Sequence, residues 1–296
     1  MDSFADRIDE IRRSRSTRNL SIPFMLFLRS KTGLASLIIL LFYVILALFA
    51  PHIAPYNPLQ VDLAKRLLPP SFSHIMGTDD FGRDIFSRVV YAIRLDLEIA
   101  LISVSIAYII GVLAGTFAGY TGKIMDNGIM RVMDIFLAFP VLIFAIAIAV
   151  TLGTGFLSII IAISVTSIPG FSRVARSTVL STKNELYVTA AVSQGASKAH
   201  ILFKHILPSA FAPTIVLYAL GLGNAISLAA ALSFLGVGIH PPTPELGAMI
   251  VEGLQYVVSG QWWMSVLPGL FIVLIVIAFN MMGDTIREVT DVSLRR

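Results

Sequence analysis

Long uninterrupted apolar runs constrain the fold of this chain more than any other feature. Each of six such runs comes near the ~20 residues that a helix needs to cross ~30 Å of hydrocarbon. Open strands cannot cross lipid, and barrel strands alternate apolar with polar residues, so unbroken runs predict helices. The six runs cover residues 33–51, 99–118, 135–152, 156–171, 213–239 and 264–282.

The composition agrees with a membrane protein. The chain is 56% hydrophobic and 14% charged, with a mean hydropathy of +0.83. A soluble domain is about a quarter charged, and a disordered chain is poor in apolar residues, so both classes are excluded. The chain has no cysteine, which excludes disulfide scaffolds, thiol nucleophiles and cysteine metal sites.

The distribution of basic residues predicts the orientation. With a cytoplasmic amino terminus, an even number of spans returns the carboxyl terminus to the same side. The outer segments then hold only Lys65, Arg66, Arg83, Arg88 and Arg94. The other 17 of the 22 Lys and Arg residues fall inside, as the positive-inside rule requires. We therefore expect an all-α integral membrane protein with six transmembrane helices and both termini in the cytoplasm. The net charge of +4 then reflects this orientation, and we expect no nucleic-acid partner.

The first outer segment, 52–93, contains GTDDFGRDIFSRVVYAIR, which predicts a helix that enters the second span. Asp79 and Asp80 would lie at its positive end, and Asp84 and Arg88 are spaced i, i+4 to pair. We expect these charges to cap the helix and to be solvated.

The second outer segment, 240–263, contains Glu245 and Glu252 but no basic residue. Its last residues, Trp262 and Trp263, fit an aromatic belt at the membrane interface.

The inner connection, 172–207, predicts a compact pair of helices. Asn184 can cap a helix ELYVTAAVSQ, Gly195 interrupts it, and Ser197 can cap a second helix that ends before Pro208. Because a local loop needs fewer residues, we expect a cytoplasmic docking surface. The alternative is an amphipathic hairpin on lipid headgroups, which Lys198 and Lys204 would also suit.

Signatures of catalysis are missing from the sequence. It contains neither H-E-x-x-H nor G-x-S-x-G, and its only Gly-Lys pair, at 122–123, lacks the rest of a phosphate-binding loop. His200 and His205 are five residues apart, which predicts different helix faces and makes them poor paired metal ligands. We therefore expect the chain not to be an enzyme.

The six spans as drawn contain no Asp, Glu, Lys, Arg or His, which argues against a proton-coupled transporter. Sodium coupling through backbone carbonyls stays open. If the protein moves a solute uphill, the energy comes from another subunit. The polar residues at membrane depth include Asn224 and Asn280, and small residues such as Ser227 line the fifth span. Helix packing is their default role, and solute contact is the alternative.

Several motifs resemble one family. TAAVSQGASKAHILFKHILP, residues 189–208, is similar to the EAA loop of ABC-importer permeases, in which Glu-Ala-Ala is followed by Gly and later by Leu-Pro. Over about residues 27–291, the chain is similar to the second permease subunit of dipeptide, oligopeptide and nickel ABC importers. The motifs that carry this likeness are APHIAPYNP, MGTDDFGRDIFSR, FLGVGIHPPTPELGAMI and WWMSVLPGLFIVLIVIAFNMMGDTIREVTD.

The resemblance implies a type I ABC importer permease in a prokaryotic plasma membrane. Its partners would be a related second permease, two cytoplasmic ATP-binding subunits and an external solute-binding protein. ATP and Mg would bind to the partner subunits, with no cofactor in this chain. The core transporter domain would span 97–286, after a cytoplasmic segment 1–32 and an extension 33–96, and before a tail 287–296.

The same resemblance assigns residues 184–208 to coupling with the ATP-binding subunit. Thr189 stands where the family has Glu, and His205 where the general pattern has Ile. The coupling residues that it implies are Thr189, Ala190, Ala191, Gly195, His205, Leu207 and Pro208. Asn224, Ser227 and Asn280 are candidates for the translocation path.

The leading hypothesis is thus an importer of dipeptides or oligopeptides. Nickel or another small solute carried by the same machinery is an alternative. A secondary transporter that acts without ATP-binding subunits is a third possibility.

Overall fold

The computed structural model describes residues 26–294, and every regular element in that range is a helix. Residues 1–25 of the predicted cytoplasmic segment and 295–296 of the predicted tail lie outside the described residues. The long helices are α3 (Lys31–Leu48), α5 (Ile85–Thr121), α8 (Phe156–Thr182), α11 (Leu207–Phe234) and α13 (Trp263–Leu294). The short ones are α4 (Ala50–Ile53), η1 (Leu63–Lys65), α6 (Lys123–Leu137), α7 (Val141–Leu152), α9 (Leu186–Ser193), α10 (Lys198–Ile201), the π-helical η2 (Leu202–Ile206) and α12 (Leu246–Val257).

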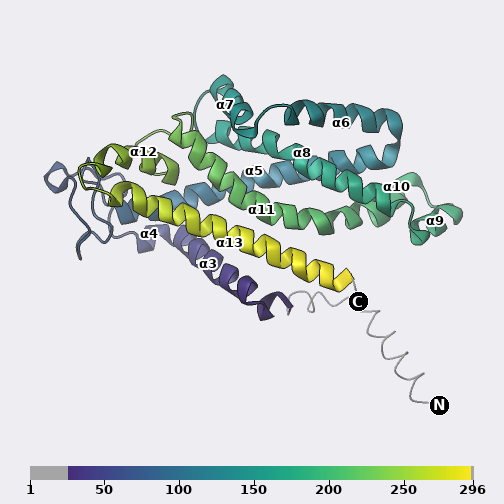
Figure 1. Cartoon of the computed structure of the whole chain (residues 1–296), viewed down its shortest axis with the longest axis horizontal. Helices are drawn as coiled ribbons and strands as arrows, with labels where there is room; N and C mark the ends of the chain where they lie inside the picture. The colour runs from purple at the N-terminus through teal and green to yellow at the C-terminus, as the bar shows by residue number, and fades with distance from the viewer. Residues whose placement is uncertain (1–25, 295–296) are drawn as a thin grey trace, which may run out of the picture.

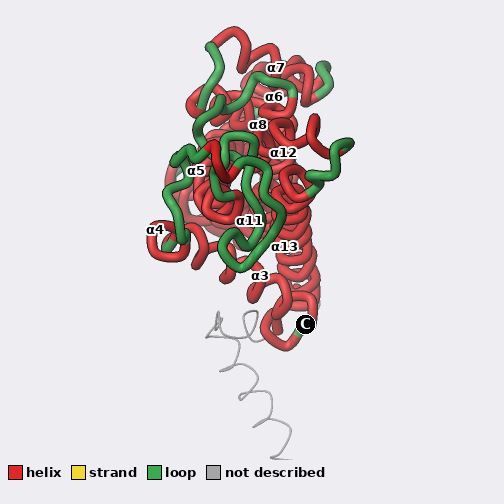
Figure 2. The backbone as a smooth tube through the Cα atoms, turned by 90° about the vertical axis from the view of Figure 1, so that its left-hand side faces the viewer, coloured by secondary structure: helices red, strands yellow, loops and turns green. Residues whose placement is uncertain are grey.

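The long helices run along the long axis of the molecule (Figure 1). α5, α8 and α11 pack against one another in the centre. α13 and α3 cover one side of this core, and α6 and α7 cover the other (Figure 2). α9 and α10 lie at one end of the bundle, here named the α10 end, and α12 lies at the opposite end, named the α12 end (Figure 1).

Five helices, α3, α5, α8, α11 and α13, are long and apolar enough to cross a membrane. The predicted third span, 135–152, is different, because α6 and α7 meet at an angle of 91°. The break lies at Pro140, which has no N–H to donate and disfavours a helical conformation at the preceding Phe139. The pair supplies a sixth span only if both arms are counted together.

The other predicted spans lie within helices that begin or end elsewhere. α5 joins the predicted outer helix and the second span into one helix of 37 residues, with Asp84 as its N-cap. α8 continues to Thr182 and α13 to Leu294, well beyond the apolar runs, because polar residues on one face still allow a helix outside lipid. α11 ends at Phe234, before the positive φ of +78° at Gly236.

Small residues let α5 and α8 approach closely. Gly111, Gly115 and Gly119 lie four residues apart and therefore on one face of α5. A Cβ at Gly115 would overlap the carbonyl oxygen of Ser172 on α8. The Ser172 hydroxyl donates to the carbonyl of Gly111 at 3.1 Å. This is the small-residue packing that helices use in lipid, where hydrophobic burial does not drive association.

α3 is attached to the bundle through α13. The Tyr43 hydroxyl donates to the carbonyl oxygen of Phe271 at 2.7 Å, and the Thr32 and Thr285 hydroxyls are 3.1 Å apart. The beginning of α3 and the last turns of α13 therefore lie side by side.

Candidate functional site

The segment between α8 and α11 is docked onto the bundle at the α10 end. Val188, Ile201 and Ile206 are buried and belong to the hydrophobic core. The Tyr120 hydroxyl at the end of α5 donates to the carbonyl of Lys198 at 3.1 Å, and the Lys183 ammonium donates to the carbonyl of Gly119 at 3.3 Å. This segment is therefore held by side chains and hydrogen bonds to α5, and its outer face is left free.

Glycine sets the turn inside the segment. Gly195 follows α9 with a φ of +80°, in the left-handed region, and a Cβ there would meet no atom within 4 Å. The need for glycine is thus conformational and not steric. Ser197 then caps α10, as predicted, by accepting from the N–H of His200 at 3.2 Å.

Three predictions for this segment were wrong in detail. The N-cap of α9 is Glu185, and the Asn184 amide donates back to the carbonyl of Leu180. The second helix does not end before Pro208, because Pro208 lies in the first turn of α11, where a missing N–H costs nothing. His200 and His205 do not face apart, since the π-helical turn η2 widens the helical repeat and leaves their ring centroids 5.8 Å apart.

The outer face of the segment exposes several large apolar side chains among polar ones. Leu186 is 86% exposed, and Tyr187, Val192 and Phe203 are about half exposed. Among the residues expected to couple, Thr189, Ala190, Gly195 and Pro208 are exposed, and Ala191, His205 and Leu207 are partly buried. Exposed apolar groups rimmed by polar residues mark a surface for protein or membrane contact.

A groove of about 500 Å³ lies between α7, α8 and α11. Its polar lining consists of hydroxyl and amide groups and carries no charge. Asn224 and Ser227 are one helical turn apart on α11 and face it, opposite Thr166 and Ser167 of α8. The rest of its lining is aliphatic: Val141, Leu142, Ile163, Ala225, Leu228 and Ala231.

Asn280 is separate from this groove. It lies on α13, where its Oδ1 is 3.8 Å from the position that a Cβ on Gly223 of α11 would take. The structure therefore brings together two of the three candidate path residues and places the third at a helix interface.

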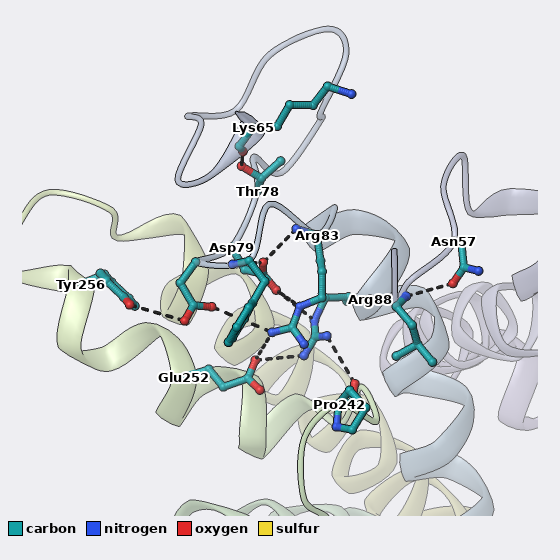
Figure 3. A network of polar contacts seen from close by, with 12 residues as sticks. Asn57, Lys65, Thr78, Asp79, Arg83, Arg88, Pro242, Glu252 and Tyr256 are labelled. Carbon is teal, nitrogen blue, oxygen red and sulfur yellow. Dashed lines mark hydrogen bonds and ion pairs between the residues drawn. The ribbon is translucent and has the colours of Figure 1, made fainter. Parts of the chain in front are cut away.

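A network of buried charges occupies the α12 end (Figure 3). Arg83 Nε donates to Asp79 Oδ2 at 2.5 Å, and Arg88 Nη2 donates to Glu252 Oε2 on α12 at 2.9 Å. Arg83 Nη2 also donates to Glu252 Oε2, at 3.3 Å. The side chains of Arg83 and Arg88 are only 4% and 2% exposed. The predicted solvation of these charges is wrong, because the loop and α12 cover them.

The contacts of Asp84 and of Trp263 also differ from the predicted ones. Asp84 caps α5 as expected, but its other contact is His74 Nδ1, at 2.9 Å, and not Arg88. Trp263 is 8% exposed and donates to the carbonyl of Thr78, while Trp262 remains 48% exposed, so only one of the two fits an interfacial belt. Burial raises the pKa of Glu252, and the positive charges of Arg88 and Arg83 counteract that rise.

The sequence holds one signal for this network. The first outer segment carries four of the five outer basic residues and Arg94 directly follows it, whereas the second segment carries acids and no Lys or Arg. Opposite charge on two segments at the same end indicates contact between them, although the pairs themselves cannot be read from it.

Two family models match the chain. The model described as "Binding-protein-dependent transport system inner membrane component" matches residues 111–296. The model described as "N-terminal TM domain of oligopeptide transport permease C" matches residues 24–70.

Similar proteins extend the match to nearly the whole chain. The dipeptide transport system permease protein DppC of Alkalihalophilus pseudofirmus is 42% identical, over 90% of this chain and 88% of its own length. The di/tripeptide transport system permease protein DppC of Pseudomonas aeruginosa is also 42% identical, over 91% of this chain and 90% of its own. The fold resembles a chain of the inward-facing MetNI methionine ABC transporter, with a TM-score of 0.55 and 20% identity, over 68% of this chain and 96% of the other.

Proposed function

Because the chain belongs to the family of binding-protein-dependent transport system inner membrane components, we propose that it forms half of the path through which an ATP-driven importer takes up short peptides. The observation that carries the solute class is the 42% identity to permeases named for dipeptide and di/tripeptide transport. The second half of the path comes from a related permease, and an external binding protein delivers the peptide.

The groove between α7, α8 and α11 is the proposed solute surface. Its hydroxyl and amide groups match the donors and acceptors of a peptide backbone, which every short peptide carries. Its aliphatic lining and lack of charge impose little selection on side chains. Recognition of the peptide then rests on the binding protein, and the permease accepts what is delivered.

The exposed face of α9 and η2 is the proposed contact for the ATP-binding subunit. Leu186, Tyr187 and Phe203 supply an apolar patch that a protein groove can bury. This assignment puts the α10 end and both termini in the cytoplasm and the α12 end outside. Thr189 is exposed on α9, where it offers a hydroxyl in place of the family's carboxylate.

The test is to purify the chain with the subunits that accompany it, reconstitute them, and measure ATP hydrolysis and uptake against a panel of peptides and Ni²⁺. We expect dipeptides and tripeptides, presented with the binding protein, to stimulate both. Stimulation by Ni²⁺ and not by peptides would change the proposed solute to nickel and leave the proposed ATP-driven mechanism unchanged. Gradient-driven uptake by this chain without ATP-binding subunits would overturn the proposal.

A further inference from the structure

Two buried carboxyl groups meet at the α12 end, outside the network of Figure 3. Asp96 lies on α5 and is 3% exposed, and Glu245 is the N-cap of α12 and is fully buried. Asp96 Oδ2 accepts from the N–H of Leu246, the residue that follows Glu245, so the two carboxyl groups lie beside each other at the start of α12. Among the described residues, neither takes part in an ion pair with a Lys, Arg or His.

The donors around the two groups can hold one negative charge. The Ala248 N–H donates to Glu245 Oε2 at 2.6 Å, and the Leu246 N–H approaches Asp96 Oδ2 at 3.4 Å. Both amides belong to the first turn of α12, whose dipole favours an anion.

One oxygen of each group is left over. Asp96 Oδ1 and Glu245 Oε1 are buried and have no hydrogen-bond partner among the described residues. Two ionised carboxylates in contact repel each other and have no hydrogen to share, whereas a proton on either one makes a hydrogen bond between them.

The charged groups nearby are engaged elsewhere. On α5, Arg88 pairs with Glu252 of α12, and Arg94 pairs with Glu98 on the exposed face at 3.0 Å. His240, in the loop before α12, is exposed. α11, α8 up to Ser172 and α13 up to Gly283 contain no Asp, Glu, Lys, Arg or His, and the charged Lys31 of α3 lies at its far end. Within residues 26–294, no cation therefore faces the pair from the helices packed around it.

We propose that Asp96 and Glu245 bind one proton between them in the folded protein, and that this proton fastens the start of α12 to α5. Peptide N–H groups point at both carboxyls, which favours a shared proton over a metal ion, because a metal needs oxygen ligands and not donors. The site is thus an acid pair that takes up a proton when the protein folds.

The burial of Glu245 also favours its protonated form. Loss of water raises the pKa of Glu245, and the N–H groups of Ala248 and Gly247 act against that rise. A carboxyl whose pKa is higher in the folded state binds more protons folded than unfolded. Its contribution to stability is therefore full at acid pH and is lost as the pH rises from the ordinary carboxyl pKa through the raised one.

Asp96→Asn provides the decisive variant, because the amide supplies permanently the hydrogen that the proton supplies in the wild type. In infrared spectra of the purified complex near neutral pH, the wild type is expected to show the carbonyl stretch of a protonated carboxyl, shifted in D₂O. Asp96→Asn is expected to lose this band. Its absence from the wild type would overturn the proposal.

Thermal unfolding against pH gives an independent reading. The melting temperature of the wild type is expected to fall as the pH rises from the ordinary carboxyl pKa through the raised one, and that of Asp96→Asn to fall less. Glu98→Gln, on the same helix with its side chain 47% exposed, is the control and should keep the wild-type slope. Glu245→Gln is a second variant if Asp96→Asn does not assemble. A wild-type slope in both amide variants would refute the shared proton, and neither readout depends on which solute is transported.

Discussion

Glu252 of α12 binds Arg88 of α5 across 164 residues of sequence, with 2.9 Å between Oε2 and Nη2. Arg83 reaches the same oxygen, so Glu252 and Asp79 together balance two buried guanidinium groups. This contact joins the loop before α5 to the helix before α13. Arg88 is the more buried member of the pair, and leaving its charge without a partner would be costly.

Glu252→Gln should therefore destabilise the protein by about 3 kcal/mol, the order expected when one partner of a buried ion pair is removed. Thermal unfolding of the purified complex measures the loss. Glu98→Gln removes the partner of Arg94 on an exposed face and should cost about 0.5 kcal/mol or less. Equal effects of the two variants would contradict the structural role of Glu252.

Gly115→Ala tests the close approach of α5 and α8. The added methyl group would overlap the Ser172 carbonyl, so the helices must move apart, at a cost of about 2 kcal/mol. The yield of assembled complex and its melting temperature should both fall. Gly128→Ala on α6, where a Cβ meets nothing within 4 Å, should leave both unchanged or slightly raised. A fully stable Gly115→Ala complex would argue against this interface.

Gly195→Asp should abolish uptake while the protein still inserts into the membrane. It places a charge on the proposed contact with the ATP-binding subunit, and a Cβ where φ is +80°. Gly195→Asn is the matched control, because asparagine tolerates the left-handed region and carries no charge. We expect it to retain much of the uptake. Membrane fractionation and uptake assays measure the two effects, and normal uptake by Gly195→Asp would exclude the coupling assignment.

Asn224→Leu and Asn280→Leu should have different consequences. Asn224 faces the groove and is exposed, so its loss should lower peptide uptake about tenfold, equivalent to ~1.4 kcal/mol, with little change in stability. Asn280 lies against α11, so its loss should lower the melting temperature. Uptake and unfolding measured on both variants test this division. Unchanged uptake by Asn224→Leu would remove it from the path.

The sequence was sufficient to predict the class and most of the helices. Apolar runs identified the membrane segments, and Ser197 identified a helix cap, because these depend on residues close together in the chain. The bend at Pro140 was missed because hydropathy is continuous across it. The segment Ile135–Leu152 therefore appeared to be one helix.

The site was less predictable. Which faces of helices meet depends on packing, so Arg83 and Arg88 could not be assigned to Glu252 from their positions alone. The proximity of His200 and His205 depends on a π-helical turn, a change in backbone hydrogen bonding that side-chain spacing does not report. The family motifs predicted an importer that draws its energy from another subunit, and the absence of ionisable residues from the predicted spans led to the same prediction.

The contacts at the α12 end have a mechanical consequence. Arg83, Arg88 and Glu252 link the loop, the first turns of α5 and α12, and the hydrogen bond from the Leu246 N–H to Asp96 adds a second link between the same two helices. The loop, α5 and α12 are therefore expected to move as one rigid body in any conformational change at the α12 end. Bending is then confined to positions without such links. Two of these are the turn at Pro140 and Gly236, where a Cβ would meet no atom within 4 Å.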